Sequence, residues 1–292
     1  MFNLKFKSLK KIEQYQQYFN NPTYSIKGEA TNIEELVKSD CWPVSVPDGL
    51  IVRNDDQIKV RAKSILYSYR VYNGGDNPNT SLYDYTSLDA KLLDYGCGGG
   101  QVVMAANEAG FNSIGYDVKV QWQNPNKLLT ANFEKIKENA PYNFILMYDV
   151  IDHIGPKDKV NEELSKIRNL CNSDTKILIR THPWTSRHAS HSYYKLNRAW
   201  AHLFLSEDQL RQYTDQEYFL KLDRPLNSYQ NMFESNGFKI DHMEIIRTPI
   251  DKFFDDPDTL SMIAKMFDGS IEWVKEVLQF EFVDYQISIN VK

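Results

Sequence analysis

A short segment of the chain combines one carboxylate with three alternating glycines. These residues are Asp94, Gly96, Gly98 and Gly100. An apolar run precedes the segment and a helix-like run follows it, so the glycines fall at a strand-to-helix turn. Glycine lets such a turn bend sharply and lets backbone N–H groups approach a ligand without a Cβ in the way. Asp117 ends the next apolar run, where a carboxylate can accept hydrogen bonds from both hydroxyls of a ribose.

The charge of this segment narrows the class of ligand. A dinucleotide fingerprint favours a small residue where Gln101 stands, and it does not normally place a carboxylate such as Asp94 beside a pyrophosphate. Asp94 instead suits a ligand with a cationic amino group. The pattern closely resembles motif I and the ribose-binding acid of the class I S-adenosylmethionine-dependent methyltransferases. This resemblance spans about residues 85–292 and implies that Asp94, Gly96, Gly98, Gly100 and Asp117 bind S-adenosylmethionine.

The segment 142–154 extends the resemblance, because it looks like the fourth strand and post-strand segment of small-molecule methyltransferases of this class. In that family the strand end passes the adenine and the methyl group, which implies that Asp149 also lies at the cofactor. The stretch between Asp117 and Tyr142 departs from the family pattern, because its helix and strand are compressed. Residues 128–133 could supply the third strand, and Asn132 is a candidate for the adenine contact.

Histidines gather after two of the expected strands, at the edge where ligands bind in open α/β sheets. A neutral imidazole can remove a proton from a methyl acceptor, so His182 or His153 is the candidate general base, with Tyr193 or Tyr194 orienting the acceptor. The alternative is that such a histidine only braces its loop. A metal site is a further reading for the histidines 182, 188 and 191, but their spacing matches no closed zinc motif, and we predict no metal.

The interval from Thr175 to Ser206 contains no Asp or Glu but carries several basic residues. Guanidinium groups bind carboxylate or phosphate in a forked geometry, so the interval predicts an anionic acceptor, with a solvated basic surface as the alternative. The candidate acceptor-binding residues are Arg180, Arg187, His188, His191 and Arg198.

These features predict an enzyme that methylates an oxygen or nitrogen of a polar, anionic small molecule. The chain lacks the Asp/Asn-Pro-Pro-Tyr/Phe motif and the Pro-Cys nucleophile of two classes of DNA methyltransferase. An RNA or nucleotide methyltransferase stays open as an alternative, because the basic interval could contact phosphate. A noncatalytic subunit that only binds S-adenosylmethionine is a second alternative.

Composition places the chain among ordinary globular proteins. Its 292 residues are 42% hydrophobic and 25% charged, which argues against disorder. A net charge of -5 disfavours a protein that coats polyanions. Three scattered cysteines without a CxxC, and the lack of an apolar run of about 18 residues or of a signal-peptide core, lead us to expect a cytoplasmic protein without a membrane segment.

The order of apolar segments predicts an α/β fold: a Rossmann-like, mostly parallel sheet with an antiparallel C-terminal edge and a helical N-terminal extension. The turn-forming stretch 73–79 suggests a boundary between a helical cover segment, 1–80, and a methyltransferase domain, 81–292, with an insertion near 183–229. A helix from Pro257 could cover the sheet or form a homodimer contact. The expected strands are Lys91–Tyr95, Ser113–Tyr116, Tyr142–Tyr148, Thr175–Arg180, Phe238–Ile246 and Phe280–Asn290.

Overall fold

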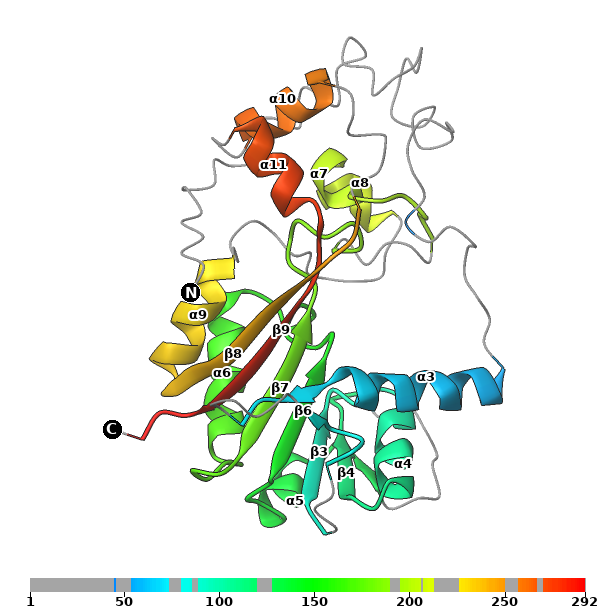
Figure 1. Ribbon diagram of the computed structural model, residues 1–292, viewed down its shortest axis with the longest axis vertical. Helices are drawn as coiled ribbons and strands as arrows, with labels where there is room; N and C mark the ends of the chain where they lie inside the picture. Colours follow the sequence, from blue (N-terminus) through cyan, green and yellow to red (C-terminus); the bar gives the residue numbers. More distant parts are fainter. Residues whose placement is uncertain are drawn as a thin grey trace.

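A computed structural model gives the architecture of the chain (Figure 1). It describes residues 45, 54–73, 80–85, 89–119, 128–189, 195–205, 207–212, 226–249, 257–266 and 270–291. Most of the predicted N-terminal cover segment, 1–80, lies outside the described residues. His191, Tyr193 and Tyr194 also lie outside them.

A mostly parallel sheet forms the centre of the fold, in the order β5-β4-β3-β6-β7-β9-β8. Its parallel strands are β3 (Lys91–Tyr95), β4 (Asn112–Tyr116), β5 (Leu129–Thr130), β6 (Phe144–Tyr148) and β7 (Lys176–Thr181). Antiparallel β9 (Phe280–Ile289) and β8 (Phe238–Arg247) complete the C-terminal edge. This topology confirms the predicted fold class, and each expected strand is present within two residues of its predicted ends.

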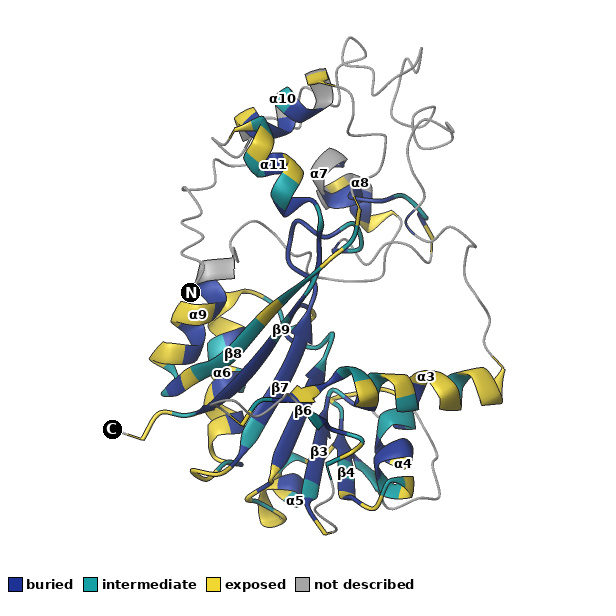
Figure 2. Cartoon of the chain, in the orientation of Figure 1, coloured by how far each residue is buried: buried dark blue, intermediate teal, exposed yellow. Residues whose placement is uncertain are grey.

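Helices cover both faces of the sheet, as the buried strands between them require (Figure 2). One face carries α3 (Asp55–Ser68) and α4 (Gln101–Glu108), which share an apolar cluster with Leu92 and Leu146. The helices of the other face are α5 (Phe133–Glu138), α6 (Lys157–Arg168) and α9 (Leu226–Ser235). The residues Val160, Leu164 and Ile167 of α6 are fully buried there, as their helical spacing predicts.

The helix α3 joins the N-terminal part of the chain to the sheet. Asn54 caps it through a reciprocal pair of hydrogen bonds with Gln57, at 2.9 and 3.0 Å. Its apolar stripe buries Ala62 and Leu66 in the cluster shared with α4. The described residues that precede the expected linker therefore pack directly on the sheet.

Smaller elements lie beyond the carboxyl ends of the parallel strands (Figure 1). They are α7 (Ala201–Phe204), α8 (Glu207–Arg211), α10 (Pro257–Met266) and α11 (Ile271–Val277). A separate two-stranded ribbon pairs β1 (Arg70–Val71) with β2 (Thr80–Ser81). Among the described residues, no helix is long and apolar enough to cross a bilayer.

A buried ion pair ties the parallel part of the sheet to its antiparallel edge. Arg180 on β7 stands opposite Asp284 on β9, and its Nε and Nη2 donate to the two carboxylate oxygens, with Nε 2.6 Å from Oδ1. The two side chains are 10% and 19% exposed. The guanidinium also lies 5.3–6.0 Å from the ring centres of Phe282, Tyr148 and Tyr69. The pair thereby joins β6, β7, β9 and the end of α3.

We expect Arg180→Met to lower the free energy of unfolding by about 3–5 kcal/mol, because the change leaves the Asp284 carboxylate buried without its partner. The double variant Arg180→Met/Asp284→Leu should recover much of that loss. Urea denaturation measures both. Arg247→Met is the control, since the Arg247–Glu276 pair is 44% and 46% exposed and its loss should cost less than about 1 kcal/mol. Equal losses at the two pairs would contradict this prediction.

Candidate active site

The glycine turn after β3 is held by hydrogen bonds to the end of β4. The N–H groups of Gly96 and Cys97 both donate to the carbonyl oxygen of Tyr116, at 2.7 and 3.0 Å. The N–H of Gly98 donates to Oδ2 of Asp117 at 2.9 Å. The turn and the predicted ribose acid therefore form one unit at the carboxyl ends of two neighbouring strands.

The glycines of the turn are required for two separate reasons. Gly96 has φ +82° and a Cβ there would lie 2.4 Å from Cγ2 of Val150, which follows β6. Gly98 has φ +50°, but a Cβ there would meet nothing within 4 Å. Gly96 thus permits close packing between the turn and the β6 end, whereas Gly98 leaves its backbone open to a ligand.

Asp94 is a buried carboxylate directly before the turn. It is 5% exposed and, within the described part of the chain, has no hydrogen-bond or ion-pair partner. Burial raises the pKa of Asp94 to about 7, and the nearby charge of Asp117 adds to the effect. A buried carboxylate without a partner is costly, so this position is suited to a ligand that brings a positive charge.

Asp149 stands at the end of β6, in a left-handed backbone conformation with φ +51°. Its Oδ1 is buried and accepts no hydrogen bond from a described residue. Burial raises the pKa of Asp149, and the neighbouring carboxyl of Asp152 raises it further. Because Val150 packs on Gly96, the end of β6 that carries Asp149 adjoins the glycine turn.

His182 follows β7 and lies beside Asp149. Its imidazole is buried, with Nε2 3.9 Å from Oδ1 of Asp149. Its Nδ1 lies 2.9 Å from the carbonyl oxygen of Glu281 and 3.0 Å from Oγ of Ser186. The ring also packs against Phe282, with 4.3 Å between the ring centres. His153, the other candidate base, has an exposed side chain in the turn after β6.

The structure brings together residues that are distant in the sequence around His188. Its Nε2 lies 3.3 Å from Oε1 of Glu281, and its Nδ1 lies 2.5 Å from Oγ of the buried Ser45. Sequence reasoning assigned no site role to Glu281 or Ser45. A charged residue between Phe280 and Phe282 was the one available signal for Glu281, and it fitted strand alternation equally well.

The basic candidates occupy different environments. Arg180 is engaged by Asp284 within the sheet, so we do not include it in the proposed acceptor site. Arg187 stacks on Trp200, with 5.4 Å between the guanidinium carbon and the ring centre, and its charge lowers the pKa of Glu281. Arg198 is half-buried in the loop before α7.

Asn132, the candidate for the adenine contact, lies at the start of a helix. Asn132 caps α5 by accepting a hydrogen bond from the Glu134 N–H at 3.0 Å, which gives this residue a structural role.

The ring centres of His182 and His188 are 5.7 Å apart. Among the described residues, no group of three His, Cys, Asp or Glu side chains is arranged to hold a metal ion.

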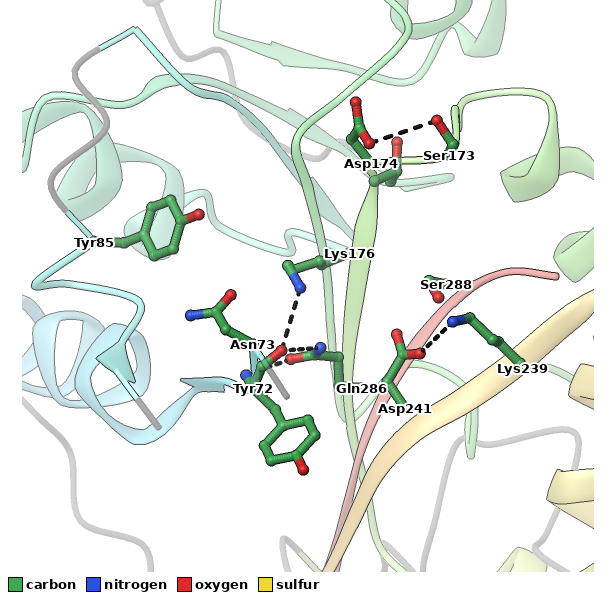
Figure 3. A pocket seen from close by; sticks show the side chains of 11 residues that line it. Tyr72, Asn73, Tyr85, Ser173, Asp174, Lys176, Lys239, Asp241, Gln286 and Ser288 are labelled. Atoms are coloured by element: carbon green, nitrogen blue, oxygen red, sulfur yellow. Dashed lines mark hydrogen bonds and ion pairs between the residues drawn. The ribbon is translucent and has the colours of Figure 1, made fainter. Parts of the chain in front are cut away.

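A separate cavity of about 540 Å³ lies at the opposite edge of the sheet, where β7 and β8 begin (Figure 3). Its lining includes Tyr72, Lys176, Lys239 and Gln286. Gln286 forms hydrogen bonds with both the N–H and the carbonyl of Tyr72, each at 2.7 Å. These bonds join the chain after β1 to β9. None of the predicted site residues lines this cavity. The candidate site is therefore the one at the carboxyl ends of the parallel strands.

Comparison with known proteins places this geometry in a family. The model of a methyltransferase domain family matches residues 76–243, which is more than half of the chain. A search of curated proteins gives no significant match. Among solved structures, an S-adenosylmethionine-dependent methyltransferase from Archaeoglobus fulgidus is 15% identical, with a TM-score of 0.47; the match covers 81% of this chain and 94% of that one.

The cyclopropane synthase MmaA2 from Mycobacterium tuberculosis is also similar, with 14% identity and a TM-score of 0.43 over 86% of this chain and all of that one. The family match covers the glycine turn, Asp117, Asp149 and the whole of the expected insertion, 183–229. The chain therefore belongs to the methyltransferase domain family, and it is a class I S-adenosylmethionine-dependent methyltransferase.

Proposed function

We propose that S-adenosylmethionine binds across the glycine turn, with Asp94 facing its amino group and Asp117 its ribose. The observation that carries this assignment is the buried, unpartnered carboxylate of Asp94 beside a turn whose Gly98 backbone is open. Asp117 already accepts hydrogen bonds from the N–H groups of Gly98 and Lys119, both at 2.9 Å, so its carboxylate is fixed at the rim of the site.

The acceptor in this proposal is a polar small molecule that is methylated on oxygen or nitrogen. The bound cofactor supplies an electrophilic methyl group; the acceptor atom forms a bond to that carbon while the carbon–sulfur bond breaks and leaves its electron pair on sulfur. The chain must align the acceptor and take up its proton. His182 is placed for that uptake, because it lies beside Asp149 at the β6 end that adjoins the glycine turn.

The charge around His182 bears on the reacting end of the acceptor. Asp149 and Glu281 lie near this imidazole, and Asp152 neighbours Asp149, while Arg180 is engaged by Asp284. This arrangement favours an acceptor whose reacting end carries no negative charge. An anionic group elsewhere on the acceptor remains part of the proposal, with Arg187 and Arg198 of the insertion as its candidate partners.

Methyl transfer to separated cell fractions tests the acceptor class. The protein is incubated with S-adenosylmethionine labelled in the methyl group and with the low-mass, RNA or protein fraction of a cell extract. Label in the low-mass fraction supports the proposal, whereas label confined to RNA supports the nucleic-acid alternative. Cofactor binding without transfer to any fraction would favour a noncatalytic binding subunit.

Two glycine variants separate ligand approach from folding. We expect Gly98→Ala to weaken S-adenosylhomocysteine binding at least about tenfold while costing roughly 1–2 kcal/mol of stability, because its Cβ enters open space from a left-handed backbone. Gly96→Ala should lose more stability, since its Cβ also collides with Val150. Calorimetric titration and thermal unfolding measure the two effects. Unchanged affinity in Gly98→Ala would contradict the proposed cofactor position.

Cofactor affinity should depend on pH through Asp94. Because the pKa of Asp94 is about 7 in the unliganded protein, its carboxylate is charged above that pH and protonated below it. The attraction for an ammonium group is therefore lost as the pH falls, and we expect S-adenosylhomocysteine to bind about 30-fold more weakly at pH 5.5 than at pH 8. Asp94→Asn should bind weakly at both values. Equal Kd values for the parent protein across this range would refute the assignment.

The role of His182 predicts a loss of turnover without a loss of cofactor binding. His182→Asn should lower kcat about 10²–10⁴-fold, as removal of a general base does, with the Kd for S-adenosylhomocysteine unchanged. His153→Asn serves as the matched control, because that side chain is exposed, and it should retain most of the activity. The opposite ranking of the two variants would transfer the role to His153.

A further inference from the structure

The hydrogen bonds of His182 define which of its ring nitrogens carries the proton. Nδ1 lies 2.9 Å from the main-chain carbonyl oxygen of Glu281, and a carbonyl oxygen can only accept a hydrogen bond. Nδ1 must therefore be the donor, and the Ser186 hydroxyl, 3.0 Å away, lies on the same side of the ring. In the neutral imidazole this leaves the lone pair on Nε2, which is the nitrogen on the side of Asp149.

The Glu281 side chain lies behind the same nitrogen. Its Oε1 is 3.9 Å from Nδ1 of His182 and 3.3 Å from Nε2 of His188. The residue is 7% exposed, and its Oε2 has no hydrogen-bond partner among the described residues. Burial raises the pKa of Glu281 to about 7, whereas the charge of Arg187 and a side-chain hydrogen bond with Thr248 act in the opposite direction. A carboxylate in such a position is stabilised when a positive charge appears beside it.

We propose that Glu281 is a positioning residue for methyl transfer: its carbonyl oxygen fixes His182 with the proton on Nδ1, and its carboxylate stabilises the imidazolium formed when Nε2 takes the acceptor's proton. The second part rests on the proposed role of His182 as the base. In this arrangement the proton moves from the acceptor to Nε2, and the positive charge that results lies between Asp149 on one side and Glu281 on the other.

Other charged groups face His182 and limit the effect of any single one. Asp149, with Asp152 behind it, approaches Nε2 from the end of β6. His188 and Arg187 approach the Glu281 side from the insertion. Two arginines lie on the Asp149 side: Arg180 on β7 pairs with Asp284, and the charge of Arg61 on α3 lowers the pKa of Asp149. Removal of the Glu281 charge should therefore weaken the basicity of His182 without abolishing it.

Nitrogen-15 NMR of the full chain tests the proposal without an acceptor. Long-range spectra of the imidazole rings should show neutral His182 with its proton on Nδ1, and the loss of one signal in His182→Gln identifies the residue. In Glu281→Gln the midpoint of the His182 titration should move to lower pH by about one unit, because the imidazolium loses a neighbouring negative charge. The control is Glu276→Gln, a carboxylate that pairs with Arg247 at the surface, and it should leave the midpoint unchanged.

A proton on Nε2 of neutral His182, or an unchanged midpoint in Glu281→Gln, would overturn the proposal. Circular dichroism establishes whether each variant is folded. If Glu281→Gln is not folded, the tautomer measured in the parent protein still decides the first part of the proposal. The titration midpoint of His182 in Glu281→Asp then tests the second part. These readouts require neither cofactor nor acceptor. A failure of the His182→Asn turnover test would therefore refute His182 as the base but not the positioning of His182 by Glu281. A failure of the NMR test would refute that positioning but not the role of His182 as the base.

Discussion

The carbonyl oxygen of Tyr116 organises the candidate active site, because it accepts hydrogen bonds from two successive N–H groups of the glycine turn. This pair fixes the turn against the end of β4 and brings Gly98 within 2.9 Å of Asp117. Val150 then packs on Gly96, so the end of β6 is set by the same turn. Two carboxylates, Asp94 and Asp149, are thereby held at the carboxyl ends of neighbouring strands, where a cationic ligand would relieve the cost of their burial.

The antiparallel strand β9 has a second organising role that its position at the C-terminal edge does not suggest. It places Asp284 against Arg180 and Glu281 against two histidines. Asp284 forms a buried ion pair with Arg180 on β7, and Glu281 lies beside the imidazole of His182, which follows β7. The same strand therefore supplies both the partner of Arg180 and the residue proposed to position His182.

Strand and helix positions were predictable because they follow from local patterns. Apolar runs such as Phe144–Tyr148 form strands wherever helices can cover both faces. The short strand β5 was harder to predict, because only Leu129 and Thr130 pair and neighbouring Asn132 begins a helix. The environments of the arginines could not be predicted, since Arg180 and its partner are separated by 104 positions and meet only through antiparallel pairing. The excess of basic residues in that interval therefore did not indicate that Arg180 pairs with Asp284 within the sheet.

The sequence by itself determined the fold class, the glycine turn and the family, because a strand, its glycines and its downstream acid act through spacing along the chain. Tertiary structure alone decided that His182 and not His153 is buried beside Asp149, and that Glu281 and Ser45 join the histidines. The physical reason is that charge, burial and proton position depend on neighbours in space. Those neighbours come from strand pairing over long sequence separations, which neither composition nor periodicity predicts.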